Sequence, residues 1–185
     1  MNIAIVIGHS RTKQGAVNKR SGLTEFAYNE PLALEIGEAL AKIGHTVNII
    51  YRHAYNQLPH DINTTNPDIV VSLHCNAYNE KATGSEVLYW NTSLRGKQAA
   101  QIFLDAICES LKLSCRGIKP KNLKSRGGFV LRNTDAPCII LEPFFIDNDL
   151  DLQRAIKNHY QFAQALIGAF EILSFVWKMP LTAQH

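Results

Sequence analysis

Three short runs of consecutive apolar residues each lead into a side chain that can bind a metal ion. The runs cover residues 3–7, 69–73 and 138–141, and the polar residues that follow them are His9, His74 and Glu142. Continuous apolar runs of this length are typical of strands that are buried on both faces of a parallel sheet. Ligands of open α/β sheets bind at the carboxyl ends of the strands. We therefore expect the two histidines and the glutamate to gather at one edge of one sheet.

Segments with helical spacing lie between the strand-like runs and predict an α/β fold. Apolar positions recur every three to four residues in a segment that ends at Gly44, in residues 94–113, and from Asp149 to about Leu173 after a cap at Asn148. Pro31 leaves two possible starts for the first helix, near Thr24 with a bend at the proline or near Asn29 with the proline in the first turn.

The remaining segments complete a single sheet. Strands are expected at residues 46–51 and 84–90, an edge strand at 127–131, and one short helix within the polar stretch 53–67. Strands that alternate with helices predict a single-domain α/β fold with a mixed, mostly parallel sheet flanked by helices on both faces.

The composition fits one globular domain. The chain has 185 residues, of which 46% are hydrophobic and 19% charged. This is enough to form a stable core without disulfides or structural metal ions. We expect a catalytic domain at residues 1–174 and a short tail at 175–185, and we expect a monomer. The cluster Phe175-Val176-Trp177 is expected to pack on the domain, with contact to an envelope surface as the alternative.

Charge and cysteine content exclude some classes of function. The net charge of +3 is mild, and basic and aromatic residues do not interleave, so no nucleic-acid partner is expected. The basic clusters at 116–121 and 124–126 are expected to be solvated loops, with guidance of an acidic partner as the alternative. The four cysteines form no CxxC pair and lie among apolar residues, so all four are expected to be small buried thiols.

The first residues do not resemble a targeting segment. No basic n-region precedes the first apolar run, which stops at Gly8 and is too short for a signal peptide or a membrane span. We expect synthesis in the cytoplasm without a signal peptide and no integral membrane segment.

Two histidines and a carboxylate suit zinc. Three protein ligands leave one position of a tetrahedral Zn²⁺ open, which is the arrangement of catalytic sites. Glu25 and Glu30 both lie near the start of the first helix, and either could supply the third ligand. Favourable interaction with the helix dipole would equally explain a glutamate there. The remaining histidines are expected to be structural or surface groups: His45, His53, His60, His159 and His185.

An ordered set of motifs resembles the zinc-dependent N-acetylmuramoyl-L-alanine amidases, a family that includes cell-division amidases, autolysins and phage endolysins. The motifs are Gly8-His9, Gly22-Leu23-Thr24-Glu25 with Asn29, Ser72-Leu73-His74-Cys75-Asn76-Ala77, Gly84-Ser85-Glu86-Val87 and Leu141-Glu142-Pro143-Phe144-Phe145-Ile146-Asp147-Asn148. No single motif is specific, but their order and spacing are, and the match runs from residue 3 to about 170.

The resemblance implies a role for each site residue. It implies that His9, Glu25 and His74 bind Zn²⁺ and that Glu142, left unligated, is the general base, with a pKa raised by its apolar surroundings. Pro31 departs from the family's uninterrupted leading helix and keeps Glu30 as an alternative ligand.

Two further polar residues are candidate substrate contacts. Asn76 could orient a ligand or touch substrate, and Arg126 could donate to the developing oxyanion or to a peptide carboxylate; both could equally be turn residues. Arg52 ends the second strand at the same edge, where a solvent-facing side chain is the usual case.

The implied activity is hydrolysis of the amide bond between N-acetylmuramic acid and L-alanine in peptidoglycan. The alternative is a non-catalytic peptidoglycan-binding or regulatory module on the same fold, which has no need of a free carboxylate at Glu142. The interval from His74 to Glu142 leaves no room for the autoinhibitory helix of some periplasmic members, so we expect no need for an activator. The tail at 175–185 is too short to fold alone, so we expect no wall-binding module there, and the chain then resembles a lysin that reaches the wall through a membrane lesion. Dedicated secretion and a cytoplasmic role on wall fragments remain alternatives.

Overall fold

The apolar runs form the centre of a six-stranded sheet in a computed structural model that describes residues 1–178. The strands are β1 (Asn2–Ile7), β2 (Thr46–Tyr51), β3 (Ile69–Leu73), β4 (Ser85–Trp90), β5 (Cys115–Lys121) and β6 (Cys138–Glu142), in the spatial order β2-β1-β3-β6-β4-β5. Strands β2, β1, β3 and β6 are parallel to one another, β4 is antiparallel to β6, and β5 is parallel to β4. The predicted mixed, mostly parallel sheet is confirmed.

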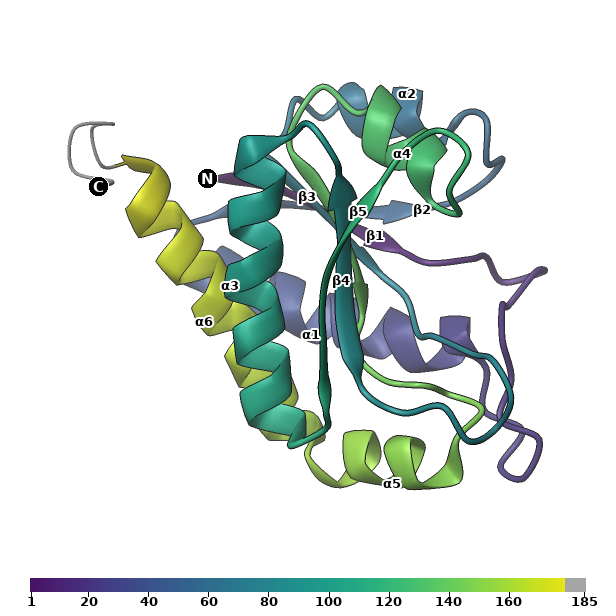
Figure 1. The fold of residues 1–185 in the computed structure, drawn as a ribbon. Coiled ribbons are helices and arrows are strands. Elements are labelled where there is room, and N and C mark those ends of the chain that lie inside the picture. Colours follow the sequence, from purple (N-terminus) through teal and green to yellow (C-terminus); the bar gives the residue numbers. More distant parts are fainter. Residues whose placement is uncertain (179–185) are drawn as a thin grey trace.

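Helices cover the two faces of the sheet unequally. Within residues 1–178 they are α1 (Glu25–Lys42), α2 (Leu58–Asn63), α3 (Leu94–Leu111), α4 (Gly128–Asn133), α5 (Asp149–Lys157) and α6 (His159–Lys178). Figure 1 shows the long helices α3 and α6 side by side along one face, with α1 on the same side, and the short helices α2 and α4 together over the other. We call these the closed face and the open face.

Strand alternation divides the core between these faces. On the closed face, residues such as Ile5, Val71 and Ile139 join the long helices in the larger apolar cluster. On the open face, residues such as Val6 and Ile140 join α2 and α4 in a smaller one. Both sets are buried, which explains why the central strands are apolar at nearly every position; Ser72 and the strand-end Glu142 are the exceptions in β3 and β6.

The first helix starts at the earlier of the two expected positions. Thr24 is its N-cap, and the Thr24 hydroxyl accepts a hydrogen bond from Ala27 N at 3.2 Å. Pro31 therefore lies inside α1, where it removes one backbone donor. This start places Glu25 in the first turn.

Two expected elements are wrong in the second half of the chain. The edge strand is β5, in a basic segment expected to be a loop, and residues expected to form that strand belong to α4. An edge strand pairs on one side only, so β5 does not need the apolar pattern of the central strands. Gly127 has a φ of 81° and precedes the first turn of α4, a conformation that favours glycine.

The C-terminal helix is divided in two. Asn148 caps α5 as expected and accepts hydrogen bonds from Leu150 N and Asp151 N, but the chain leaves helical geometry at Asn158 and continues as α6. Residues 175–178, expected in a tail, extend α6. Trp177 of the expected apolar cluster packs on the domain and donates to Gln98 Oε1 at 2.8 Å. The rest of the expected tail, residues 179–185, lies outside the described residues.

The expectation of four buried thiols is half correct. Cys75 and Cys138 are buried and free, but Cys108 at the end of α3 and Cys115 at the start of β5 form a disulfide. Cys115 is exposed, because the edge strand begins at the surface. No helix within residues 1–178 has both the length and the hydropathy of a transmembrane span.

Candidate metal centre and cavity

The expected histidines and glutamates meet at one edge of the sheet. His9 follows β1, His74 follows β3, and Glu142 is the last residue of β6. The ladder continues past the strands, since Gly8 N donates to Leu73 O at 2.9 Å and His74 N donates to Leu141 O at 3.1 Å. His74 and Glu142 therefore lie in one row across the open face, one step beyond the buried row of Ser72 and Ile140.

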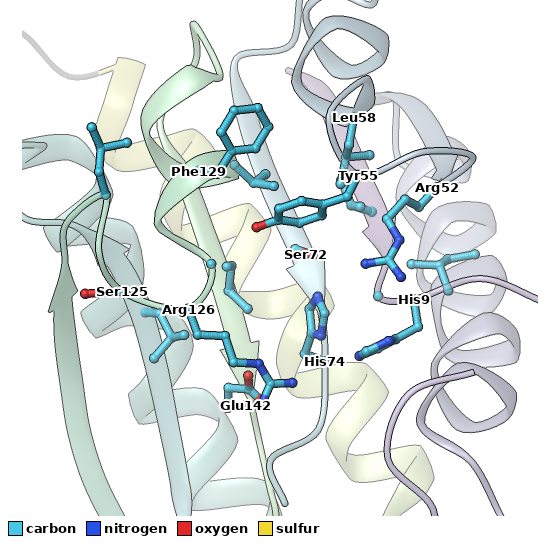
Figure 2. Close-up of a pocket in the computed structure, with 18 residues that line it drawn as sticks. His9, Arg52, Tyr55, Leu58, Ser72, His74, Ser125, Arg126, Phe129 and Glu142 are labelled. Atoms are coloured by element: carbon cyan, nitrogen blue, oxygen red, sulfur yellow. The ribbon is translucent and has the colours of Figure 1, made fainter. Parts of the chain in front are cut away.

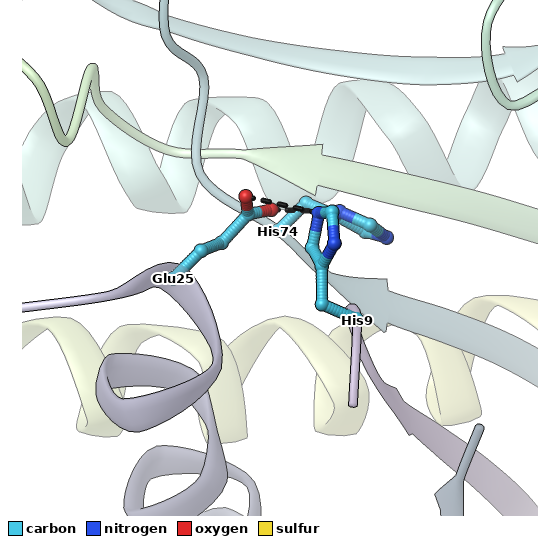
Figure 3. Close-up of side chains that lie close together, drawn as sticks. All are labelled: His9, Glu25 and His74. Carbon is cyan, nitrogen blue, oxygen red and sulfur yellow. Dashed lines mark hydrogen bonds and ion pairs between the residues drawn. The ribbon is translucent and has the colours of Figure 1, made fainter. Parts of the chain in front are cut away.

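Figure 3 shows the Glu25 carboxylate beside the rings of both histidines. Its Oε1 is 2.8 Å from His74 Nδ1 and its Oε2 is 3.0 Å from His9 Nε2. Potential ligand atoms of the three residues all lie within 4.8 Å of one another. Two backbone amides fix the carboxylate further, because Cys75 N donates to Oε1 at 3.0 Å and Ala16 N donates to Oε2 at 3.2 Å.

The electrostatics of this group favour a bound cation. Glu25 is fully buried, and burial by itself would raise its pKa, but His74 and His9 outweigh burial and hold the pKa of Glu25 well below its usual range. The buried carboxylate is thus an anion, which is costly without a positive partner. His9 Nε2 is buried and, despite its short distance to Glu25, has no partner with hydrogen-bond geometry. Two imidazoles, one carboxylate and an unsatisfied ring nitrogen fit Zn²⁺.

The backbone around the group is shaped by close approaches. His9 has a φ of 68°, which is uncommon for a residue with a side chain. Gly15, with a φ of 81°, closes over the group: a Cβ there would lie 2.6 Å from Glu25 Oε2 and 2.6 Å from His9 Cδ2. Gly15 lies in a polar loop and carries no signal in the sequence, because its positive φ and its close contacts arise only in the folded structure.

Glu30, the alternative third ligand, lies in a different environment. Its Oε1 accepts a hydrogen bond from Arg11 Nη2 at 2.8 Å, and it does not belong to the group of His9, Glu25 and His74. The geometry favours Glu25 as the third member.

Glu142 lies beside this group in a cavity of about 450 Å³ on the open face. Figure 2 shows His9, His74 and Glu142 at one end of this cavity. Glu142 is 6% exposed, and its Oε2 has no hydrogen-bond partner among the described residues. Burial raises the pKa of Glu142 to about 8, with Glu25 and Glu86 adding to the effect and Arg126 and Lys121 opposing it. The desolvated carboxylate expected from the sequence is confirmed.

Glu86 lies directly across from Glu142 in the antiparallel pair of β4 and β6. Its carboxylate forms an ion pair with Arg116, whose Nε donates to Glu86 Oε2 at 2.9 Å. Asn76 Nδ2 donates to the other oxygen, Oε1, at 3.0 Å. Asn76, expected as a substrate contact, is thus committed to Glu86 and does not line the cavity. Arg126 does line it, from the loop before α4.

Several cavity residues had no expected role. Arg52 lines the wall beside His9, and Tyr55, Leu58 and Phe129 come from the segments around the short helices α2 and α4. Only Arg52 carried a signal in the sequence, its position at the end of a strand. The others belong to segments whose packing depends on the tertiary fold.

Comparisons with known proteins agree with this geometry. The sequence model of a family described as N-acetylmuramoyl-L-alanine amidase matches residues 3–171. The probable cell wall amidase LytH of Staphylococcus epidermidis is 28% identical over 145 residues, which are 78% of this chain and 47% of that protein. The chain therefore spans about half the length of the curated relatives it matches.

Solved structures share the fold. The catalytic domain of the CD27L endolysin, which targets Clostridia difficile, has a TM-score of 0.78 at 27% identity and covers 91% of this chain and 96% of its own. Cwp6 from Clostridium difficile has a TM-score of 0.81 at 27% identity and covers 93% of this chain and 29% of its own. The family match extends from β1 into α6 and includes every residue of the metal group and the cavity, so the chain belongs to the N-acetylmuramoyl-L-alanine amidase family.

Proposed function

We propose that the protein hydrolyses the amide bond between N-acetylmuramic acid and L-alanine in peptidoglycan. In this proposal His9, Glu25 and His74 hold Zn²⁺, and Glu142 is the general base. The catalytic domain comprises residues 1–174, and α6 continues it to Lys178. The protein acts on the cell wall as a monomer and without nucleic acid.

The state of Glu142 is the observation that carries the proposal. A buried carboxylate oxygen without a hydrogen-bond partner is costly, and a protein that only binds its ligand has no need to retain one. Glu142 lines the same cavity as His9 and His74, so substrate in that cavity contacts both the metal group and the carboxylate. This combination supports turnover over binding alone.

The donor set defines what each residue contributes. His9, Glu25 and His74 would hold Zn²⁺, which would supply Lewis acidity to the scissile carbonyl and to the attacking water. Glu25 contributes a permanent negative charge, because its pKa lies well below its usual range. Its backbone donors, Cys75 N and Ala16 N, keep the carboxylate oriented toward the two imidazoles.

Glu142 moves the proton. Its carboxylate accepts a proton from the attacking water and donates it to the departing amine of L-alanine. A pKa near 8 in the absence of a cation suits this exchange, because a general base is most effective when its pKa is close to the working pH. Arg126 lines the same cavity as Glu142, where we expect it to contact the substrate.

Peptidoglycan sacculi provide the test. Purified zinc-loaded protein should release stem peptides with free N-terminal L-alanine, detected by mass spectrometry, and a chelator should abolish release. Glu142→Gln is the matched control, since it keeps the shape of the side chain and the metal group but should lower kcat by about 10²- to 10⁴-fold. Release should need no activator protein.

Other outcomes would overturn the proposal. Intact sacculi with one zinc bound per chain would support the binding module instead. Full activity in Glu142→Gln would remove Glu142 as the base, and release that begins only with an added partner would contradict the expected activity without an activator.

A further inference from the structure

A second feature of the open face is a pair of arginines that point into the cavity from opposite sides. Arg52 follows β2, directly after Tyr51, which pairs with Ile7 of β1. It therefore lies in the same row across the sheet as His74 and Glu142, on the same face. Figure 2 shows the Arg52 guanidinium near His9 and the Arg126 guanidinium near Glu142.

These two arginines combine a place in the cavity with a lack of polar partners. Among the described residues, Arg95 and Arg132 also lack polar partners, but each lies over a tryptophan ring and outside the cavity. Arg11, Arg20, Arg116 and Arg154 each donate hydrogen bonds to an acidic side chain or a backbone carbonyl. Within residues 1–178, neither Arg52 nor Arg126 donates a hydrogen bond or forms an ion pair, although both line the cavity. The Arg52 guanidinium carbon lies over the Tyr55 ring, 5.8 Å from its centroid, a contact that occupies none of the N–H donors in a hydrogen bond.

Tyr55 connects the two sides of the cavity. Burial raises the pKa of its phenol, and the positive charges of Arg52 and Arg126 both oppose this effect, so both guanidiniums act on the same phenol. The floor beneath them is apolar, formed by Val6, Leu88 and Ile140. The cavity thus combines an apolar base with positive donors on either side.

We propose that Arg52, Arg126 and Tyr55 form a binding site for a substrate carboxylate close to the scissile amide. The carboxylate is the α-carboxylate of the D-glutamate that follows L-alanine in the stem peptide. The protein should therefore prefer stem peptides in which this carboxylate is free over those in which it is amidated. The inference rests on the proposed amidase function and specifies its substrate.

The chemistry of the site matches a carboxylate. Guanidinium groups bind carboxylates through paired, charge-assisted hydrogen bonds, which an amide forms less well because its NH₂ group meets another donor. The apolar floor excludes water and favours the peptide part of the ligand. Each peptide residue spans about 3.5 Å, so a carboxylate one residue beyond L-alanine remains close to the bond beside Glu142.

Two small muropeptides test the preference directly. They are N-acetylmuramoyl-L-alanyl-D-glutamate and its α-amide, N-acetylmuramoyl-L-alanyl-D-isoglutamine, compared by kcat/KM with zinc-loaded protein. The wild type should cleave the acid about tenfold to a hundredfold more efficiently, the usual range for a hydrogen bond to a charged group. Arg52→Gln and Arg126→Gln should each lower this ratio, and the double variant should bring it near one.

Further variants separate recognition from folding. Arg132→Gln is the matched control, because Arg132 lies over the Trp90 ring at 5.8 Å and does not line the cavity; it should keep the wild-type ratio. Arg52→Lys and Arg126→Lys keep the charge but lose the paired donors, so their ratios should lie between those of the wild type and the glutamine variants. Thermal melts identify any variant that fails to fold.

Binding measurements distinguish failure of this inference from failure of the amidase assignment. Calorimetry with Glu142→Gln should show tighter binding of the acid than of the amide. Cleavage of both muropeptides at one rate, with equal binding, would overturn the carboxylate site and leave the amidase standing. Preferential binding of the acid without any cleavage by the wild type would overturn the amidase and leave the site.

Discussion

The two faces of one sheet are built from alternate residues of the same strands, yet they serve different purposes. On the closed face, the long helices α1, α3 and α6 pack on a continuous apolar layer. On the open face, α2 and α4 are six residues long and leave a cavity of about 450 Å³. Burial of apolar residues on the closed face stabilises the sheet. This stabilisation offsets the unfavourable free energy of burying polar groups on the open face.

The contrast is sharpest where the strands end. One step beyond the apolar floor, the open face presents Arg52, His74, Glu142 and Glu86 in a single row. A row of charged and titratable residues disfavours folding unless its charges are matched, so the rest of the fold must compensate. Unequal layers therefore predict unequal responses to mutation.

Truncation of a phenylalanine on each face tests this inequality. Phe103 in α3 is fully buried in the larger cluster, where its ring packs on Phe170 with centroids 4.9 Å apart. Phe103→Ala should lower the free energy of unfolding by about 3 to 5 kcal/mol. Phe129→Ala in α4 should cost about 1 to 2 kcal/mol, because Phe129 is half-buried and borders the cavity. Urea unfolding followed by circular dichroism measures both, and equal losses would contradict the division of the core.

The sequence predicted the closed face and the metal group for related reasons. Central strands that are buried on both faces are mostly apolar on both, so β1, β3 and β6 were found with nearly correct ends. The residues that follow them reach the same edge by topology alone, which brought His9, His74 and Glu142 together. Choice of Glu25 needed the family's motif, since Glu30 lies just as near the helix start.

The open face was largely beyond prediction. Its edge strand β5 is basic and paired on one side, so it lacks the apolar pattern by which the central strands were found. Helix α4 is too short to show helical periodicity and depends on the backbone at Gly127. The disulfide between Cys108 and Cys115 depends on the proximity of the end of α3 and the start of β5, and β5 was not foreseen.

A pH series on the metal-free protein should expose the cost of the polar row. The pKa of Glu142 rises from its usual value near 4.5 to about 8 on folding, so the native state binds a proton that the unfolded chain releases. Stability from this group is therefore greatest at low pH and declines as pH rises from about 4.5 to 8. Glu142→Gln removes the titration, and at pH 9 it should be more stable than the wild type by on the order of 1 to 3 kcal/mol.

The range from pH 5 to pH 9 isolates Glu142 from Glu25. The pKa of Glu25 is lowered on folding, so its contribution is complete above about pH 5 and is lost only at lower pH. Thermal melts of both proteins across this range provide the measurement. If the melting temperatures of the two proteins changed with pH in parallel, Glu142 would be as well solvated in the folded protein as in the unfolded chain. Burial of Glu142 on the open face would then not destabilise the protein.

Gly15, which closes over the metal group of His9, Glu25 and His74, offers a more local test. Gly15→Ala should weaken zinc binding by about 10- to 100-fold, because the added methyl would displace Glu25 Oε2 and His9 from their present positions. Gly22→Ala is the matched control: Gly22 also has a positive φ, of 73°, but a Cβ there meets no atom within 4 Å. Chelator competition measures the affinity of each. Similar losses in both variants would assign the effect to backbone strain and not to the fit around the metal group.

The smallest effect is expected at Glu30, the alternative to Glu25 as third ligand. Glu30→Gln breaks an ion pair with Arg11, whose side chain is 73% exposed, and should change stability by less than about 1 kcal/mol. Zinc binding, measured by metal analysis after dialysis, should remain at one ion per chain. Glu25→Gln, in contrast, removes the buried anion between two imidazoles and should abolish stoichiometric binding. Loss of zinc from Glu30→Gln alone would instead make Glu30 the third ligand. The start of α1 would then have to move, because Glu30 now pairs with Arg11.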